Sequence, residues 1–398
     1  MRVLILTNRV PYPLNDGGAL GMDVFLKGYP EAGCTSRLLA MNTSRHFTDP
    51  ARLPAVWPGL EAIRTIPVNN DIKPISLVRN WLLSREPYHV TRFESNAFSE
   101  ALQQELQQFQ PEVVHIESPF LASYLPTIRN IAPAAKAVFR MNNVEAEIWE
   151  RLAHETAHPV KRRYLKNLSR RMAAYEQKIW PLFDWLLPVT AADATVAARV
   201  VPETRIQVVP FCIDLAAYPV QPWPLALAGY HLAAMDWLPN VEAVRWFAEQ
   251  VAPLVTQSAP EVPLTFAGRH MPESLKALAS GTIQITGEVA DAQAFTADKP
   301  ILVVPLRSGG GIRVKILEAM ASGKLIISTT VGMQGIPVVP GVQALIADSP
   351  EAFAQALARV VAEPLWAQTI AKAGRAFVEA HFDRSRILAG WVDALQKQ

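Results

Sequence analysis

A glycine-rich segment between two apolar runs is the part of this chain best suited to chemistry. Ile301 to Pro305 is an apolar run typical of a buried strand, and Lys324 to Thr330 predicts the next strand. Between them lie the loop Arg307-Ser308-Gly309-Gly310-Gly311 and an amphipathic helix expected over Ile312 to Ala321, which Gly323 would end. Glycine main-chain N–H groups at the positive end of a helix dipole bind anions, so this pattern predicts a phosphate site.

Charged residues in the first turns of this helix extend the prediction. Arg313 and Lys315 add fixed positive charge, and Glu318 lies about one turn deeper, within reach of a pair of ribose hydroxyls. The combination points to a nucleoside diphosphate. A tight turn without a ligand, and a solvated Glu318 paired with Lys315, are the alternatives. The spacing differs from the dinucleotide fingerprint, because no third glycine stands where Arg313 and Val314 are.

Length and composition limit the class of protein. The 398 residues suggest two or three domains, and 50% hydrophobic residues are enough for large cores. We find no apolar run long enough to span a membrane and no signal peptide, so we expect a cytoplasmic protein. Cys34 and Cys212 predict isolated buried thiols and no metal site. A net charge of +2 does not favour nucleic acid as a partner.

One segment is strongly basic. Lys161-Arg162-Arg163, Lys166, Arg170 and Arg171 would cover much of one helix surface. A solvated helix explains them. The alternative is attraction to a polyanionic acceptor or to an anionic membrane, which would make the protein peripheral at the inner face of that membrane.

Alternating strands and helices predict an α/β fold, because parallel strands need helical crossovers that cover both faces of the sheet. In the first half we expect the strands Val3–Thr7, Ser36–Met41, Ala62–Val68, Val113–Glu117, Ala137–Met141 and Trp185–Val189, and the helices Gly18–Lys27, Ser95–Phe109, Asn143–Glu155 and Val160–Pro181.

The same alternation resumes after a proline-rich linker at 208–224. The expected strands are Ala226–Leu232, Pro263–Ala267, Gln284–Thr286, Ile301–Pro305, Leu325–Ser328 and Ala344–Ala347. The expected helices are Asn240–Thr256, Met271–Ala279, Ala290–Thr296, Ile312–Ala321, Pro350–Val361, Leu365–His381 and Ser385–Lys397. The chain is therefore predicted to form two Rossmann-like, doubly wound parallel-sheet domains, residues 1–212 and 213–382, which face a cleft. We expect a final helix in 383–398 to pack back on the first domain.

Polar residues at two strand ends of the first domain are candidates for binding an acceptor. Asn15-Asp16-Gly17-Gly18 follows the first strand and is predicted to be the counterpart of the 309–311 loop. A turn with an Asp helix cap is the alternative. Asn142, Asn143 and Glu145 follow another strand, and helix capping by Asn143 is the alternative there.

Several segments together resemble the GT-B glycosyltransferases, and among them the retaining group called family 4. The most specific is PLRSGGGIRVKILEAMASGKLIISTTVGMQGI at 305–336. The others are PYPLNDGGA at 11–19, VVHIESP at 113–119, FCIDLAAY at 211–218, MDWLPN at 235–240 and AGRH at 267–270. The resemblance covers nearly the whole chain.

The resemblance implies roles for individual residues. Glu318 matches the family acid that holds the ribose hydroxyls, and Arg269 and Lys315 are candidates to neutralise the diphosphate. The residues implied to meet the donor are Ser308, Gly309, Gly310, Gly311, Ile312 and Arg313. The donor would be a UDP- or GDP-sugar, and no essential metal or other cofactor is expected.

Three departures from the family pattern concern the chemistry. Gly310 stands where relatives often carry an acid that contacts the donor sugar. The segment AAMDWLPN at 233–240 lacks the usual Arg and Lys pair. Glu117 occupies the place of an active-site histidine, and His115 lies two residues earlier, on the same face of a strand. We therefore name Glu117, His115 and Glu318 as candidate catalytic residues, with a satisfied core histidine as the alternative for His115.

These observations predict a retaining transferase that moves a sugar to a glycan, a lipid-linked or a small-molecule acceptor, in synthesis of bacterial exopolysaccharide or cell-surface glycan. The acceptor would bind the first domain near Gly17, Gly18, Asn143 and the 117–119 turn, and closure about the linker would exclude water. A sugar-nucleotide 2-epimerase and a catalytically silent nucleotide- or glycan-binding subunit are the alternatives.

Overall fold

The computed structural model describes residues 1–14, 17–224, 226–309 and 311–397. The chain divides into two compact units, which are treated separately below. The first unit comprises Met1–Cys212 with Arg384–Gln398, and the second comprises Ile213–Asp383. Asn15, Asp16 and Gly310, three residues of the predicted site loops, lie outside the described residues.

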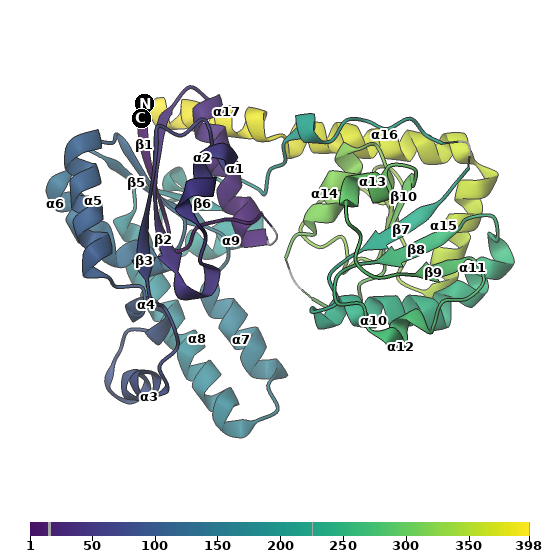
Figure 1. The fold of residues 1–398 in the computed structure, drawn as a ribbon, viewed down its shortest axis with the longest axis horizontal. Coiled ribbons are helices and arrows are strands. Elements are labelled where there is room, and N and C mark those ends of the chain that lie inside the picture. The colour runs from purple at the N-terminus through teal and green to yellow at the C-terminus, as the bar shows by residue number, and fades with distance from the viewer. Residues whose placement is uncertain (15–16, 225, 310, 398) are drawn as a thin grey trace. The chain divides into compact units, whose positions relative to one another are not determined.

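The first unit is built on a parallel six-stranded sheet with the order β3-β2-β1-β4-β5-β6 (Figure 1). Its strands are β1 Arg2–Thr7, β2 Thr35–Thr43, β3 Ala62–Val68, β4 Val113–Ile116, β5 Lys136–Met141 and β6 Trp185–Pro188. The central register places Ile5 of β1 between Leu38 of β2 and His115 of β4. Most of β1 and β4 is buried, as expected for parallel strands with both faces covered.

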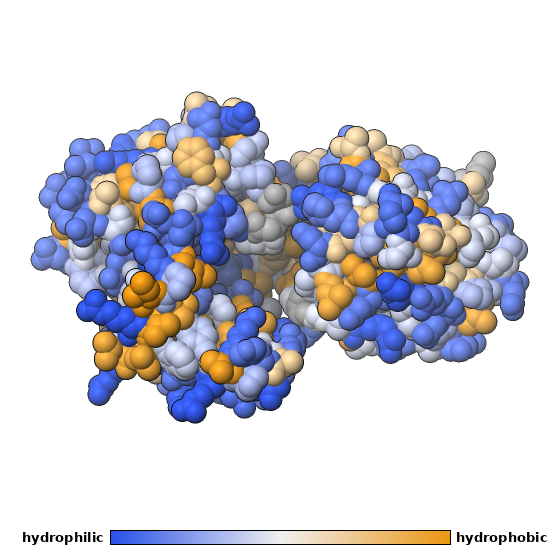
Figure 2. Space-filling view, turned by 60° about the horizontal axis from the view of Figure 1, so that its bottom comes forward, coloured by the Kyte–Doolittle hydropathy of each residue, from blue (hydrophilic) through white to orange (hydrophobic). Residues whose placement is uncertain are grey.

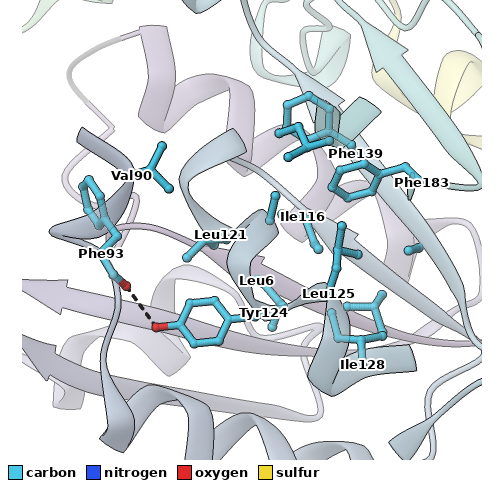
Figure 3. Packing of buried hydrophobic residues seen from close by; sticks show 14 of the residues in the cluster. Leu6, Val90, Phe93, Ile116, Leu121, Tyr124, Leu125, Ile128, Phe139 and Phe183 are labelled. Carbon is cyan, nitrogen blue, oxygen red and sulfur yellow. Dashed lines mark hydrogen bonds between the residues drawn. The ribbon is translucent and has the colours of Figure 1, made fainter. Parts of the chain in front are cut away.

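Helices cover both faces of this sheet. They are α1 Gly17–Glu31, α2 Leu53–Val56, α3 Pro74–Leu83, α4 Tyr88–Thr91, α5 Asn96–Phe109, α6 Leu125–Ile131, α7 Glu145–Glu155, α8 Pro159–Ile179, α9 Ala191–Ala197 and α17 Arg384–Gln396. The helices α1 and α17 pack on one face. Figure 3 shows the opposite core, where Leu6 and Ile116 meet side chains of α6, and the Tyr124 hydroxyl donates to the Phe93 carbonyl at 2.9 Å.

The second unit repeats this topology. Its parallel sheet has the order β12-β11-β10-β7-β8-β9, so the fourth strand of each unit lies beside the first. The strands are β7 Gly229–Leu232, β8 Leu264–Ala267, β9 Ile283–Ile285, β10 Ile301–Val304, β11 Leu325–Ser328 and β12 Leu345–Ile346. The helices are α10 Leu238–Trp246, α11 Ala252–Ser258, α12 Glu273–Lys276, α13 Ala292–Thr296, α14 Val314–Ala321, α15 Pro350–Ala362 and α16 Pro364–His381, with a π-helical turn at Phe247–Val251. Two doubly wound parallel sheets confirm the predicted fold class.

Several predicted elements need correction. The helix α3 was not predicted, although Ile75, Val78 and Leu82 stand at helical spacing in the sequence. The helix α14 begins at Val314, because residues 311–313 remain in the loop. The loop after β1 is not the counterpart of the 309–311 loop. By strand order β10 corresponds to β4, so the counterpart is the turn that begins at Glu117.

The contact between α1 and α17 yields a test of packing. A Cβ atom on Gly28 would lie 2.6 Å from Cγ of Leu388, so Gly28→Val should force the two helices apart. We expect the free energy of unfolding to fall by about 1–3 kcal/mol, measured by denaturant titration. The matched control is Gly390→Ala on α17, where a Cβ meets nothing within 4 Å. It should stabilise the protein by about 0.5–1 kcal/mol. Equal stability of wild type and Gly28→Val would contradict the packing.

Candidate functional site

The glycine-rich loop of the second unit lies where the strand order reverses. It follows β10, which pairs with β7 on one side and with β11 on the other. Crossover connections from neighbouring strands run to opposite faces at such a point, and ligands of open α/β sheets bind there, at the carboxyl ends of the strands. The candidate donor site is therefore placed by the topology of the sheet.

Two glycines of the loop are required by its shape. Gly309 and Gly311 have φ angles of 103° and 84°, values that other L-residues rarely adopt. A Cβ on Gly309 would lie 2.5 Å from the Trp237 ring. Arg313 stands over the same ring at 5.0 Å and donates from Nη1 to the Gly311 carbonyl at 2.9 Å. Arg313 is buried and helps to shape the loop.

Lys315 of α14 and Arg313 just before it have different surroundings from those predicted. Lys315 donates from Nζ to the Leu232 carbonyl at 3.2 Å, at the end of β7. Burial lowers the pKa of Lys315 to about 7, with nearby Arg313 lowering it further and Glu318 opposing. For Lys315 the predicted positive charge is therefore not fixed near neutral pH. Arg313 keeps its positive charge, although burial lowers its pKa.

Glu318 is held by a residue far away in the chain. Its Oε1 accepts a hydrogen bond of 2.7 Å from the hydroxyl of Tyr218. Burial raises the pKa of Glu318, whereas the Tyr218 hydrogen bond and Lys315 lower it. The alternative of a solvated Glu318 paired with Lys315 does not describe this arrangement, since the partner in contact is Tyr218.

A cavity of about 220 Å³ opens beside Glu318. Its polar lining includes Tyr218, Tyr230, Gln293, Lys315, Glu318 and Lys324. The Lys324 ammonium lies 5.6 Å from the centre of the Tyr230 ring and donates to the Lys299 carbonyl at 2.9 Å. Burial lowers the pKa of Lys324 to about 8. A carboxylate, a nearby lysine and a buried aromatic ring suit the hydroxyls, charge and flat base of a nucleotide.

The structure brings only part of the predicted donor set to this cavity. Lys315 and Glu318 line it. Ser308 instead donates to Glu242 at 3.0 Å, Ile312 packs against Gly335, and Arg269 is exposed just after β8. The analysis of the sequence did not select Tyr218, Tyr230, Gln293 or Lys324. Of these four residues, only Tyr218 lies in a segment that carried the family resemblance, as the last residue of FCIDLAAY.

In the first unit, His115 and Glu117 form part of a buried hydrogen-bonded chain. Trp391 Nε1 donates to the Tyr29 hydroxyl at 3.0 Å, and that hydroxyl lies 2.9 Å from His115 Nδ1. His115 Nε2 lies 2.9 Å from Glu117 Oε1. The expectation that both side chains share one face of the strand is confirmed.

The donors in this chain determine its direction. An indole nitrogen can only donate, so the Tyr29 hydroxyl accepts from Trp391 and gives its own proton to His115 Nδ1. His115 Nε2–H must then donate to Glu117. The reverse arrangement would bury the Tyr29 hydroxyl proton without an acceptor. His115 is fully buried with both nitrogens paired, which is the satisfied core histidine of the alternative interpretation. It orients the Glu117 carboxylate.

Glu117 has further polar neighbours. Asn142 Nδ2 lies 3.3 Å from the Glu117 carbonyl and 3.4 Å from its Oε2. Arg140 is buried nearby and donates to the Leu187 carbonyl at 3.2 Å. Burial lowers the pKa of Arg140, and the charge of Glu117 opposes that shift. The Glu117 carboxylate therefore sits buried, between a histidine donor and an amide donor.

The remaining acceptor candidates are exposed. Gly17 and Gly18 begin α1, and Asn143 precedes α7. Asn143 does not cap α7, so that alternative is wrong: the carboxylate of Glu176 accepts from the N–H groups of Glu145 and Ala146 at 2.8 and 3.1 Å. Burial raises the pKa of Glu176 to about 8 and that of Glu145 to about 7.

Comparison with known proteins places this geometry in a class. Residues 230–363 match the model of the family Glycosyl transferases group 1, so the second unit carries such a domain. A protein described as an uncharacterized 44.6 kDa protein in the cps region of Klebsiella pneumoniae is 25% identical over 159 residues. That match covers 38% of this chain and 41% of the relative.

Solved structures match the fold over its full length. Anabaena HepE in complex with UDP has a TM-score of 0.66 at 13% identity and covers 100% of both chains. Sucrose-phosphate synthase from Thermosynechococcus elongatus has a TM-score of 0.67 at 16% identity, covering 100% of this chain and 99% of that one. The fold is the GT-B fold, and residues 230–363 are similar to a glycosyltransferase domain.

The direction of the buried chain can be tested with Tyr29→Phe. This variant leaves His115 Nδ1 without its donor and Trp391 Nε1–H without its acceptor, so the free energy of unfolding should fall by about 1–3 kcal/mol. Nitrogen NMR of the His115 ring should show the Nε2–H tautomer as the sole form in wild type. In Tyr29→Phe it should no longer be the sole form. A wild-type ring protonated at Nδ1 would contradict the assignment.

The lowered pKa of Lys315 predicts how binding of a nucleoside diphosphate depends on pH. A bound diphosphate favours the charged lysine, so Lys315 must take up a proton above its free pKa of about 7. The affinity for UDP should therefore fall as pH rises from 7 to about 8.5, by up to about tenfold per pH unit. Calorimetry in buffers of different ionisation enthalpy should register the proton uptake. Lys315→Met should remove both effects, and an unchanged pH profile in that variant would contradict the role of Lys315.

Proposed function

We propose that this chain is a retaining glycosyltransferase that moves a sugar from a UDP- or GDP-sugar to a glycan or lipid-linked acceptor. The observation that carries the proposal is Glu318 in the 220 Å³ cavity, beside Lys315, on the helix that follows the glycine-rich loop after β10. The matched group 1 domain contains all of these residues.

Glu318 would hold the ribose. A carboxylate accepts through both oxygens, and its Oε1 is already oriented by the Tyr218 hydroxyl. A ribose offers two adjacent hydroxyl donors, which a buried carboxylate binds more strongly than water does. Tyr230 and Gln293 would then face the base, because they line the same cavity.

The diphosphate would meet the loop 307–313 and Lys315. Charge accumulates on the leaving diphosphate as the glycosidic bond breaks, so a lysine that becomes protonated there stabilises the transition state more than the ground state. Arg269, exposed after β8, is a second cation for this charge. We include no essential metal in the proposal.

The choice of donor and pathway draws on the similar proteins. The Anabaena protein was solved with UDP and also with UDP-glucose, which favours a uridine nucleotide here. The Klebsiella relative belongs to a cps region, which favours polysaccharide synthesis. Gly310 stands in place of an acid that many relatives direct at the sugar, so the choice of sugar would depend on other residues.

The acceptor would bind the first unit. Glu117 is held by His115 and Asn142 at the carboxyl end of β4, and Asn143, Gly17 and Gly18 are exposed at the same sheet edge. A fixed carboxylate can orient or accept a proton from an acceptor hydroxyl. In α8 the cations from Lys161 to Arg171, of which all but the half-buried Arg171 are exposed, would contact an anionic membrane that presents a lipid-linked acceptor.

Glu318→Ala tests the assignment directly. Loss of a charged acceptor for ribose hydroxyls should weaken UDP binding by about 1.5–3 kcal/mol, roughly tenfold to a hundredfold, and reduce turnover as well. Calorimetry with UDP and a transfer assay measure the two effects, and thermal unfolding checks the fold.

The matched control is Glu273→Ala, because Glu273 is an exposed helix acid of the same unit. It should bind UDP as wild type does. Turnover at the wild-type rate by Glu318→Ala would refute the role of Glu318. Binding without transfer by the wild-type protein, across many acceptors, would favour a silent binding subunit.

A further inference from the structure

The helix α3 exposes an apolar face that none of the described residues of its own unit covers. None of its residues is buried. Ile75, Val78 and Leu82 recur at helical spacing on the outer side and are 86%, 48% and 71% exposed, and Leu83 beside them is 80% exposed. Figure 2 shows hydrophobic side chains gathered on this part of the first unit among strongly hydrophilic ones. Apolar residues clustered in this way mark an interaction surface.

Contacts on the inner side hold α3 in this orientation. Trp81 packs edge-to-face on Tyr164 of α8, with ring centres 5.5 Å apart. Arg171 of α8 donates from Nη2 to Asn80 Oδ1 at 2.8 Å and also bonds the carbonyl of Glu86. Because Asn80 and Trp81 of α3 contact α8, the exposed apolar residues are directed away from it.

The two segments that form this face carry charge of one sign, and the exposed acids Asp71 and Glu86 stand just outside the first segment. Residues 72–85 contain three basic residues and no acidic one, and residues 159–175 of the adjoining α8 contain six and none. Tyr164 and Arg171 mark the side of α8 that faces α3, and Arg163 and Arg170 each precede one of them, on the neighbouring exposed stripe. The surface is therefore apolar at its centre and basic at its border.

We propose that α3 inserts Ile75, Val78, Leu82 and Leu83 into the boundary between headgroups and acyl chains of an anionic bilayer, while Arg79, Arg163 and Arg170 contact its phosphates. Apolar side chains surrounded by lysine and arginine suit a short helix that lies in the plane of a membrane. A second copy of the chain fits less well, because it would bring the same unbalanced cations together.

The surface also has a physical link to the candidate acceptor site. Tyr175 of α8 donates to the Pro119 carbonyl at 3.0 Å, in the turn that follows Glu117. A bilayer bound at α3 and α8 would thus lie next to the region where a lipid-linked acceptor is needed. This link rests on the proposed function, whereas binding to the bilayer does not depend on the donor site.

The test is co-sedimentation of the full chain with vesicles of phosphatidylcholine alone or mixed with phosphatidylglycerol. We expect binding to the anionic vesicles that weakens as salt is added. The double variant Ile75→Ser with Leu82→Ser should lose about tenfold or more in affinity, because both side chains would lose their burial in lipid. The matched control is Leu365→Ser, an exposed leucine of α16 in the second unit, which should bind as wild type does.

A second pair of changes, Arg163→Gln with Arg170→Gln, should reduce the salt dependence and the preference for anionic vesicles. Equal binding of wild type and the Ile75→Ser, Leu82→Ser variant would overturn the proposal. The proposal would also be overturned if wild type formed a dimer in solution, the variant abolished that dimer, and neither protein bound vesicles. A second copy of the chain would then cover the apolar face of α3. UDP binding, measured on the same variants, should be unchanged. If the wild-type protein did not bind UDP, that result would count against the donor site and would leave the vesicle result intact.

Discussion

Parallel pairing of β7 with β10 is the constraint on which the candidate donor site depends. Because β10 is the fourth strand of its unit and lies beside the first, the connections that leave β7 and β10 go to opposite faces, and the space between them at the carboxyl edge is open to a ligand. The Lys315 ammonium uses that arrangement directly, since it binds the last carbonyl of β7. The same strand order in the first unit places Glu117 at the corresponding position after β4.

Burial of charge gives the two units different chemical characters. In the second, Lys315 and Glu318 both have their charged forms disfavoured by burial, so each gains from a ligand that supplies the opposite charge or a hydrogen-bond donor. In the first, the carboxylate of Glu117 already has its donors in His115 and Asn142. The site of Lys315 and Glu318 therefore gains hydrogen bonds and charge pairing when a ligand binds. The Glu117 carboxylate is already oriented by residues of the protein.

The sequence was sufficient for much of the fold, because parallel strands buried on both faces are continuous apolar runs. Leu325–Ser328 and Ala62–Val68 were predicted with the bounds that the structure has. The glycine loop was also recognisable, since positive φ at Gly309 and Gly311 demands that residue type.

Features that depend on distant contacts were not predictable. Tyr218 binds Glu318 across 100 residues, and Glu176 caps α7 from 31 residues away, so no local pattern announces either. The charge of Lys315 depends on how deeply the fold buries it, which spacing does not report. The helix α3 was missed for a different reason, since the spacing of Ile75, Val78 and Leu82 was present in the sequence and was not used.

The path of the chain has a consequence for synthesis on the ribosome. Tyr29 and Trp391, hydrogen-bonded in one unit, are 362 residues apart, and the whole second unit is inserted between the two segments that build the first. The nascent first unit therefore stays incomplete on its α1 face until α17, Arg384–Gln396, has left the exit tunnel. A chain that lost only its final residues would keep an intact second unit and a first unit with an open core.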